Sequence, residues 1–214
     1  GLTEIPKSML IVGAGVIGCE FACIYRELGT EVTMVEMMPR AVITEDPEIS
    51  ALLEKELKKK KIKLYTNVKV EKVDVRDDGV HAFLSDGKEI IAEKELVSIG
   101  RALNSDGLGL ENAGVAKGKR NEITVNEKME TNVPGIYALG DVTGGMLIAH
   151  IASTQGLVAA KNIMGHSSNM DYSVVPAAIF TYPEIASVGL REHQAEEKGI
   201  KITTGHFQFR ALGK

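Results

Sequence analysis

Cysteines are scarce in this 214-residue chain, which holds only two, and long hydrophobic runs are absent. Two cysteines cannot form the disulfide framework of a small secreted protein, so a reduced intracellular setting is predicted. No apolar run reaches the roughly 18 residues that a membrane-spanning helix needs, and no basic segment followed by an apolar one opens the sequence. We therefore expect a cytoplasmic protein without a membrane partner. Because Gly1 stands in place of an initiating Met, we also expect that something was removed from the chain or that it is a piece of a longer one.

Excess positive charge is missing as well, since the formal net charge is −4 and the pI is near 5.8. This balance argues against a nucleic-acid partner. The lysine run at residues 58–61 falls at the end of an expected helix, where it complements the helix dipole, and we interpret it as a solvated face. No histidine has neighbours at metal-ligand spacing, so no metal site is predicted. The remaining composition, 44% hydrophobic and 25% charged, is typical of a globular protein with one large or two small domains.

A glycine-rich motif near the start of the chain organises the prediction. Residues 8–12 form a short apolar run, typical of a parallel strand buried on both faces. The motif follows at once and a helical pattern continues to Leu28; the motif residues are Gly13, Ala14, Gly15, Val16, Ile17 and Gly18. In a dinucleotide-binding loop the first glycine permits the tight turn, the second leaves no Cβ in front of the pyrophosphate, and the third lets helix and strand pack closely. The helix start would then face the phosphates with its free N–H groups.

A second apolar run, residues 31–35, ends on the acidic Glu36, about 20 residues after the loop, where a carboxylate holds the adenosine ribose hydroxyls. A carboxylate repels the 2′-phosphate of NADP, so Glu36 favours NAD as the cofactor. Arg40 is the counter-indication, because an arginine near this position is able to accept that phosphate.

The following pattern predicts an α/β fold, a Rossmann-like parallel sheet with an antiparallel β crossover. Asp46 and Pro47 are suited to start a helix, and residues 62–66 form a third strand, so the order strand, helix, strand, helix, strand implies right-handed crossovers. Two further strands, residues 80–85 and 88–92, are joined by Asp86 and Gly87, a strong hairpin signal. The chain then returns to a strand at 95–99 that ends at Gly100 on the carboxyl edge of the sheet.

Beyond Arg101 the pattern is glycine-rich and irregular. We expect short strands at residues 123–125 and 135–141 and a long helix at 147–163. A helix at 191–197 and a strand at 202–209 are expected near the end. That last strand has no neighbour in the sequence to pair with, which again indicates a truncated chain.

Five segments of the chain resemble the flavin-dependent pyridine nucleotide-disulfide oxidoreductase family, and within it the dihydrolipoamide dehydrogenases. They are residues 13–18 with Glu20, the strand end at Glu36, residues 99–104, residues 131–141 and residues 179–189. Together they span nearly the whole chain in the order of the family. The sequence departs from the family pattern at Leu103, where proline is usual, and at Thr154 and Gln155, where acidic residues are frequent.

The resemblance implies a division into an NAD-binding domain (residues 1–122), the C-terminal half of an FAD-binding domain (123–173) and the start of a dimerisation domain (174–214). It also implies that Glu20, Val70 and Gly100 line the nicotinamide nucleotide. Asp141 would hold the flavin ribityl chain. The residues implied to lie against the flavin ring are Leu147, Ile148, Ala149 and His150.

The same resemblance indicates what this stretch of sequence does not contain. The redox cysteine pair and the His-Glu dyad of the family lie outside it, so no catalytic residue is predicted and the chain alone is expected to be inactive, without retained FAD. Cys19 and Cys23 are four residues apart on one helix face and are interpreted as buried small apolar residues.

Three interpretations of the function stay open. The first is an NAD(H)-binding portion of a dihydrolipoamide dehydrogenase, whose intact form would work in a 2-oxoacid dehydrogenase complex. The second is a stand-alone NAD-binding or sensing module. The third is a related mercuric, glutathione or coenzyme A disulfide reductase. Because residues 147–209 cannot bury their apolar faces alone, we also expect either a homo-oligomer through this tail or poor order in it.

Overall fold

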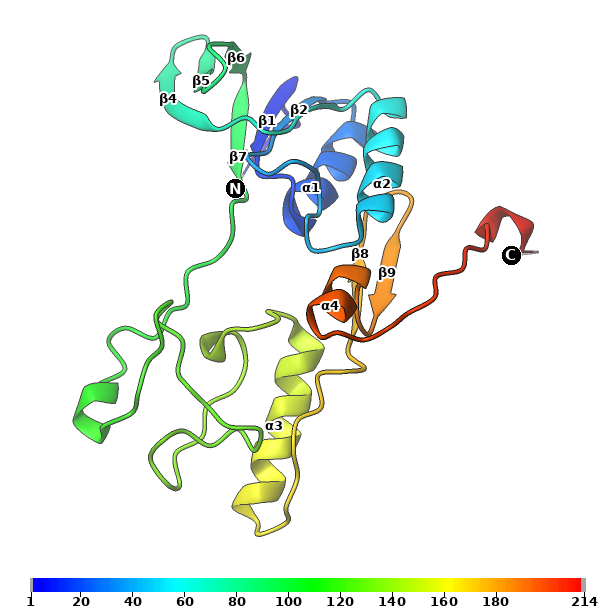
Figure 1. Ribbon diagram of the computed structural model, residues 1–214. Helices are drawn as coiled ribbons and strands as arrows, with labels where there is room; N and C mark the ends of the chain where they lie inside the picture. The colour runs from blue at the N-terminus through cyan, green and yellow to red at the C-terminus, as the bar shows by residue number, and fades with distance from the viewer. Residues whose placement is uncertain (1, 213–214) are drawn as a thin grey trace. The chain divides into compact units, whose positions relative to one another are not determined.

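The computed structural model describes residues 2–212, and these form two compact units. Residues 2–99 together with 177–212 make the first unit, and residues 100–176 make the second. Figure 1 traces both along the chain. None of the helices within residues 2–212 combines the length and the apolar character needed to cross a membrane.

A four-stranded parallel sheet lies at the centre of the first unit, with the strand order β3-β2-β1-β7. Its strands are β1 (Ser8–Val12), β2 (Glu31–Val35), β3 (Lys63–Tyr65) and β7 (Lys94–Val97), and the connecting helices are α1 (Val16–Glu27) and α2 (Pro47–Lys59). The predicted Rossmann-like sheet is therefore confirmed. Each strand and helix expected for this sheet is present, with ends that shift by at most two residues.

The parallel sheet is covered on both faces, which explains the continuous apolar pattern of β1. Met9 and Ile11 point to a core that also contains Cys19 of α1 and Leu57 of α2. Leu10, which alternates with them along the strand, lies in a separate core with residues of the antiparallel sheet. The two faces of the sheet therefore contribute to two separate apolar cores, of which the one beside α1 and α2 is the larger.

The antiparallel crossover is also confirmed. Strands β4 (Val70–Arg76), β5 (Gly79–Leu84) and β6 (Glu89–Ala92) form a three-stranded sheet, and the turn at residues 86–87 joins the last two as expected. Ala82, Leu84 and Ala92 pack from this sheet against Leu10 and Val35 of the parallel one.

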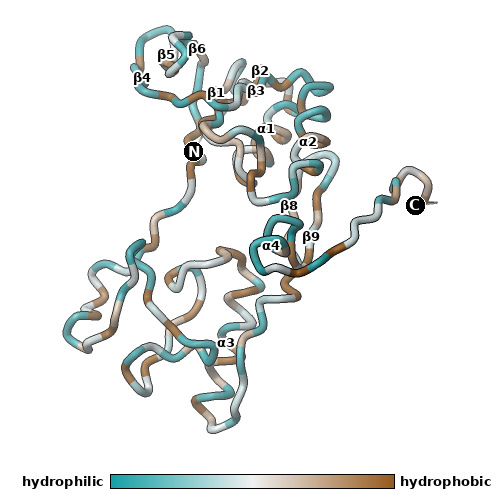
Figure 2. The backbone as a smooth tube through the Cα atoms, in the orientation of Figure 1, coloured by the Kyte–Doolittle hydropathy of each residue, from teal (hydrophilic) through white to brown (hydrophobic). Residues whose placement is uncertain are grey.

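The C-terminal segment packs against the helix side of the first unit. It contains β8 (Pro176–Ile179), β9 (Ile185–Val188), the short helix α4 (Glu192–Glu197) and the 3-10 turn η3 (Phe209–Ala211). Ile179 is buried in the core of α1 and α2, and Ile185 packs against it. Figure 2 shows β8 and β9 as mostly hydrophobic stretches and α4 as a hydrophilic one. The expected strand at 202–209 is wrong, because no second strand lies beside this stretch within residues 2–212.

The second unit has little regular structure besides helix α3 (Ala149–Ile163), which begins two residues later than predicted. Its core gathers Met129, Ile151, Val158 and Met170. The short turns η1 (Leu110–Ala113) and η2 (Asp141–Thr143) complete it. The strands expected at 123–125 and 135–141 are wrong: these stretches form only isolated bridges, Lys117 with Ile123 and Glu130 with Tyr137. Glycines 135 and 140 adopt positive φ, which interrupts any extended ladder.

Candidate functional site

The register of the parallel sheet brings three strand ends together. Val12 of β1 lies opposite Val35 of β2 on one side and opposite Val97 of β7 on the other. The residues that follow these strands, Gly13, Glu36 and Ser98, are therefore neighbours at the carboxyl edge. β2 and β7 flank β1 although the chain visits β2 first, so this edge is the topological switch point where open α/β sheets bind ligands.

Two of the three motif glycines are required by packing. Gly13 has φ +101°, and a Cβ there would lie 2.6 Å from the carbonyl oxygen of Ser98. A Cβ on Gly18 would lie 2.0 Å from the carbonyl oxygen of Gly13. Only glycine allows α1 to approach β1 and β7 this closely.

Gly15 differs from them, because a Cβ at this position would meet no atom within 4 Å. Packing therefore does not require glycine here, and its missing side chain leaves the backbone open on the outer side of the loop. Gly15 is also the N-cap of α1, which has no side-chain cap and no acidic residue in its first turn. The free N–H groups of a helix start and the positive end of its dipole favour an anion. This opening fits a pyrophosphate.

The side chain of Glu36 contacts the glycine loop at Ala14. Its side chain is almost buried, with 9% of the residue exposed. One carboxylate oxygen (Oε2) accepts a hydrogen bond from Ala14 N at 2.6 Å and the other (Oε1) from Met38 N at 2.8 Å. Each oxygen keeps a second lone pair, so the carboxylate is able to accept ribose hydroxyls from this position.

Arg40 uses its guanidinium within its own loop. Its Nη2 donates to the carbonyl oxygens of Ile43, at 3.1 Å, and Glu45, at 3.2 Å. A guanidinium engaged in this way is less available to a 2′-phosphate, so this contact weakens the counter-indication to NAD.

Ser98 is a site residue that the sequence reasoning missed. Its hydroxyl lies 3.0 Å from the carbonyl oxygens of both Val12 and Gly13, so it donates to one or the other and fixes the turn. The sequence placed Ser98 inside the expected strand 95–99, whereas β7 ends at Val97 and leaves Ser98 at the carboxyl edge. A serine alone carries no such information, because its partners are about 85 residues away in the chain.

The remaining residues predicted for the nicotinamide nucleotide lie on three different segments of the chain. Glu20 lies one turn into α1, and its Oε1 accepts a hydrogen bond from Phe180 N at 2.9 Å. Val70 begins β4 and packs half-buried against the core of the antiparallel sheet. Gly100, with φ +119°, begins the second unit, and a Cβ there would meet no atom within 4 Å.

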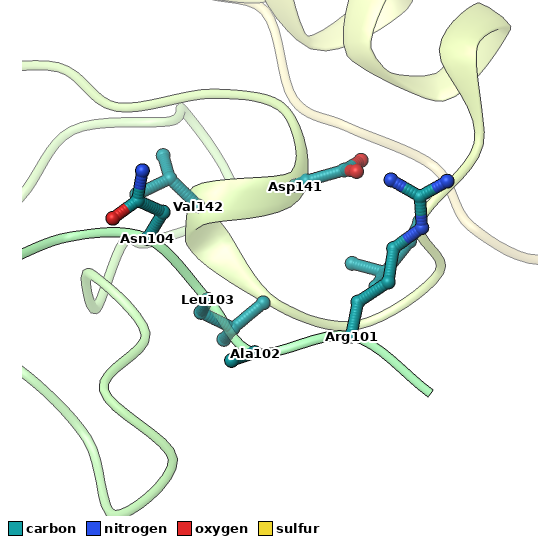
Figure 3. Close-up of a pocket in the computed structure, with 7 residues that line it drawn as sticks. Arg101, Ala102, Leu103, Asn104, Asp141 and Val142 are labelled. Atoms are coloured by element: carbon teal, nitrogen blue, oxygen red, sulfur yellow. The ribbon is translucent and has the colours of Figure 1, made fainter. Parts of the chain in front are cut away.

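The second unit contains a pocket of about 450 Å³ that includes the predicted Asp141 (Figure 3). The lining residues are Arg101, Ala102, Leu103, Asn104, Asp141, Val142 and Leu147. In Figure 3 the guanidinium of Arg101 and the carboxylate of Asp141 point toward one another across the opening. Arg101 and Asn104 were part of the recognised sequence segment but were not named as site residues. Leu103, which departs from the family's proline, lines the pocket with only 7% of the residue exposed.

The other residues predicted for the flavin surround the start of α3. Leu147 lines the pocket, Ile148 packs against the core of the unit and is the N-cap of the helix, and Ala149 and His150 form its first turn. His150 is exposed and its Nε2 lies 2.9 Å from the carbonyl oxygen of Pro176.

Gln155 on the same helix explains a departure from the family pattern. The residue is buried, with 3% exposed. Its Oε1 accepts a hydrogen bond from Gly140 N at 2.7 Å, and its Nε2 donates to the hydroxyl of Tyr172 at 2.9 Å. The amide satisfies both neighbours without a buried charge, and it holds the turn that precedes Asp141.

Both cysteines are buried, as predicted, with 0% of Cys19 and 4% of Cys23 exposed. Burial raises the pKa of the Cys19 thiol far above its ordinary value, and the neighbouring Cys23 and Glu36 act in the same direction. A thiol that stays protonated is a poor nucleophile and a poor redox partner. Within residues 2–212 no three His, Cys, Asp or Glu side chains assemble into a metal-binding group.

Comparison with known proteins matches residues 2–156 to the family described as pyridine nucleotide-disulphide oxidoreductase and residues 175–214 to the dimerisation domain of the same family. A dihydrolipoyl dehydrogenase of Chlamydia pneumoniae is 42% identical over 213 residues, which cover 100% of this chain and 46% of that protein. The chain thus spans about half the length of the curated relatives it matches.

Solved structures agree with this assignment. The structure of LpdA from Mycobacterium tuberculosis matches with a TM-score of 0.86 and 34% identity, covering 92% of this chain and 43% of that one. The flavoprotein disulfide reductase RclA from Escherichia coli matches with a TM-score of 0.86 and 29% identity, over 93% and 46% of the two chains. The resemblance seen in the five sequence segments is therefore confirmed, and the chain belongs to the pyridine nucleotide-disulphide oxidoreductase family.

Proposed function

We propose that this chain is the NAD(H)-binding portion of a flavin-dependent, dihydrolipoamide dehydrogenase-like oxidoreductase. The intact protein would pass a hydride from dihydrolipoamide to NAD. The observation that carries the proposal is the carboxylate of Glu36, which lies 2.6 Å from Ala14 N directly beside the open position of Gly15. One edge of the sheet thus presents an opening for a diphosphate and an acceptor for a sugar hydroxyl.

The proposed roles follow from this edge. The pyrophosphate would rest on the backbone of residues 13–18, and Glu36 would hold the adenosine ribose and disfavour a 2′-phosphate by charge repulsion. Glu20, Val70 and Gly100 would line the nicotinamide nucleotide, as the family resemblance implies. Bound NAD supplies a carbon that accepts or releases a hydride, and the residues of this chain bind and orient it.

The second unit would hold part of the flavin nucleotide in the intact protein. Asp141 presents its carboxylate at the mouth of a pocket of about 450 Å³, as a partner for the ribityl hydroxyls. Leu147, Ile148, Ala149 and His150 would lie against the flavin ring. Because the chain covers only 46% of the length of its Chlamydia pneumoniae relative, we propose that the chain alone does not retain FAD and does not reduce lipoamide. The intact protein would be a homo-oligomer and a component of a 2-oxoacid dehydrogenase complex.

The test is a fluorescence titration of the chain with NADH and NADPH, beside a Glu36→Arg variant. We expect a micromolar to millimolar dissociation constant for NADH and weaker binding of NADPH. The variant loses the ribose acceptor and gains a cation, so its preference should move toward NADPH by about tenfold or more, equivalent to about 1.4 kcal/mol. Glu31→Arg, which makes the same charge change at an exposed position of β2, is the matched control.

If Glu36→Arg fails to fold, Glu36→Gln keeps the shape of the side chain without its charge, and circular dichroism reports whether the fold is intact. Weaker NADH binding by folded Glu36→Gln supports the proposal. Tighter binding of NADPH than NADH by the unaltered chain would contradict it, as would unchanged NADH binding by a folded Glu36 variant.

A related disulfide reductase with another electron acceptor is the second candidate. The likeness to RclA favours it, since its TM-score of 0.86 equals that of LpdA. Sequence identity favours the first candidate, because the chain is 42% identical to the Chlamydia pneumoniae dihydrolipoyl dehydrogenase and 29% identical to RclA. Assaying the intact protein with dihydrolipoamide and NAD separates the candidates, and no turnover of that pair would exclude the first.

A further inference from the structure

A buried ion pair joins the C-terminal segment to the loop between β2 and α2 within the first unit. The guanidinium of Arg191, the N-cap residue of α4, forms two hydrogen bonds to the carboxylate of Glu45, from Nε at 3.0 Å and from Nη2 at 2.9 Å. The two side chains are only 14% and 7% exposed. Paired, parallel hydrogen bonds of this kind are strong and fix geometry. Arg191 also donates to the hydroxyl of Ser187 and the carbonyl oxygen of Gly189, and these bonds fix the orientation of its guanidinium.

Glu45 belongs to the segment that connects β2 to α2, residues 37–46, which we call the strap. The strap begins directly after Glu36 and lies on the glycine loop, because Val42 N donates to the carbonyl oxygen of Ala14 at 2.8 Å. Val42 is 1% exposed and has φ +41°, a conformation that β-branched residues rarely adopt. Such a backbone persists only where its surroundings hold it in place.

The surroundings of the strap lead to Glu45. Glu45 N donates to the carbonyl oxygen of Val42 at 2.8 Å, and Arg40 Nη2 donates to the carbonyl oxygens of Ile43 and Glu45. The same strap supplies Met38 N to the carboxylate of Glu36. A continuous set of hydrogen bonds therefore runs from Ala14 and Glu36 at the loop to Glu45 at the far end of the strap.

The neighbouring residue strengthens the link to the C-terminal segment. Asp46 occupies the N-cap position of α2, as the sequence predicted, yet its side chain makes no bond to its own helix. Its Oδ1 instead accepts a hydrogen bond from Glu192 N at 3.0 Å. The end of the strap is thus attached twice to the start of α4, through two consecutive acidic residues.

We infer that Arg191 and Glu45 are positioning residues for the dinucleotide: their ion pair holds the strap, and through it the loop of Ala14 and the carboxylate of Glu36, in the arrangement that binds NAD. The inference rests on the proposed function. It makes docking of the C-terminal segment and binding of the cofactor mutually reinforcing, since coupling between two sites is reciprocal.

The test compares NADH affinity across four variants of the full chain, at a temperature well below unfolding. Arg191→Met and Glu45→Gln each break the pair, and we expect each to weaken NADH binding about tenfold, within the usual range of coupling between sites. The double variant should bind no more weakly than either single variant, because the pair acts as a unit. Glu48→Gln is the matched control: Glu48 contacts His206 of the same segment at 3.3 Å through an exposed pair outside the strap, and its loss should leave the affinity unchanged.

A second measurement separates coupling from simple stabilisation. The backbone N–H of Glu192 donates to Asp46, so its hydrogen exchange reports on the attachment of α4. Bound NADH should slow this exchange in the unaltered chain, and should slow it less in Glu45→Gln. If Arg191→Met does not fold, Arg191→Lys keeps the charge and should give an intermediate loss of affinity.

The outcomes are distinguishable. Folded variants with a lower melting temperature but unchanged NADH affinity would overturn the inference alone, since the pair would then only fasten the segment. Additive losses in the double variant would overturn it too. No NADH binding by the unaltered chain would overturn the proposed function, and the inference with it.

Discussion

Replacing two of the motif glycines with alanine should separate stability from binding: Gly18→Ala should lose stability, and Gly15→Ala should lose NADH affinity. In Gly18→Ala the new Cβ would lie 2.0 Å from the carbonyl oxygen of Gly13 and 2.7 Å from the hydroxyl of Ser98. Both atoms are held by the strand ends, so helix α1 must move outward. Overpacking of this kind costs about 1–3 kcal/mol or more, against a gain of about 1 kcal/mol from the helix propensity of alanine.

We therefore expect Gly18→Ala to lose up to about 2 kcal/mol of stability, which lowers the melting temperature by up to roughly 4–8 °C in a chain of this size. Gly15→Ala has φ −72° and no neighbour within 4 Å of its Cβ, so it should unfold within roughly 2–4 °C of the unaltered chain. Its methyl group would instead stand where the diphosphate must approach, and NADH affinity should fall about tenfold or more.

Thermal unfolding and NADH fluorescence titration of the two variants, measured side by side, decide the matter. The reasoning would be refuted if Gly15→Ala bound NADH as tightly as the unaltered chain. It would also be refuted if Gly18→Ala kept its melting temperature, because the close contact of α1 with the loop would then not constrain the fold.

Three further predictions concern the rest of the first unit. Hydrogen bonds with Glu89 and Asp78 raise the pKa of His81 above its ordinary value. The protonated His81 therefore stabilises the folded chain fully below about pH 6.5, and this stabilisation is lost as pH rises through the raised pKa. His81→Gln should remove this pH dependence of the melting temperature. Leu57→Ala, at a site 1% exposed, should cost about 2–5 kcal/mol in urea unfolding, whereas Leu52→Ala, at a site 54% exposed, should cost little. Both cysteine thiols, being buried, should react with a thiol reagent only after unfolding, and rapid labelling of the native chain would contradict this.

Local patterns were sufficient for the elements whose partners are adjacent in sequence. The hairpin of β5 and β6 was predicted from its two-residue turn, and the helix α2 from its cap, proline and apolar stripe. The same patterns predicted strands at 123–125, 135–141 and 202–209 that do not form. A strand requires a partner at hydrogen-bonding distance, and an apolar stretch by itself does not say whether one is present.

The position of a side chain was also easier to predict than its partner. Asp46 stands at the start of α2 as expected but bonds to Glu192, 146 residues away. Nothing in the sequence indicated that Ser98 and Gln155 would each fix a turn beside a candidate site. Their bonds depend on which strand ends and helices the fold brings together.

The sequence by itself determined the glycine motif, the acidic residue at the end of β2 and the order of strands and helices, because these follow from steric limits and from hydrophobic periodicity along the chain. Only the tertiary structure decided that Gly13, Glu36 and Ser98 lie together at one edge of the sheet. It also decided that Gly15 alone of the three motif glycines faces open space and that Arg191 forms an ion pair with Glu45. Those relations depend on register and on long-range packing, which a chain acquires only when its sheet is assembled.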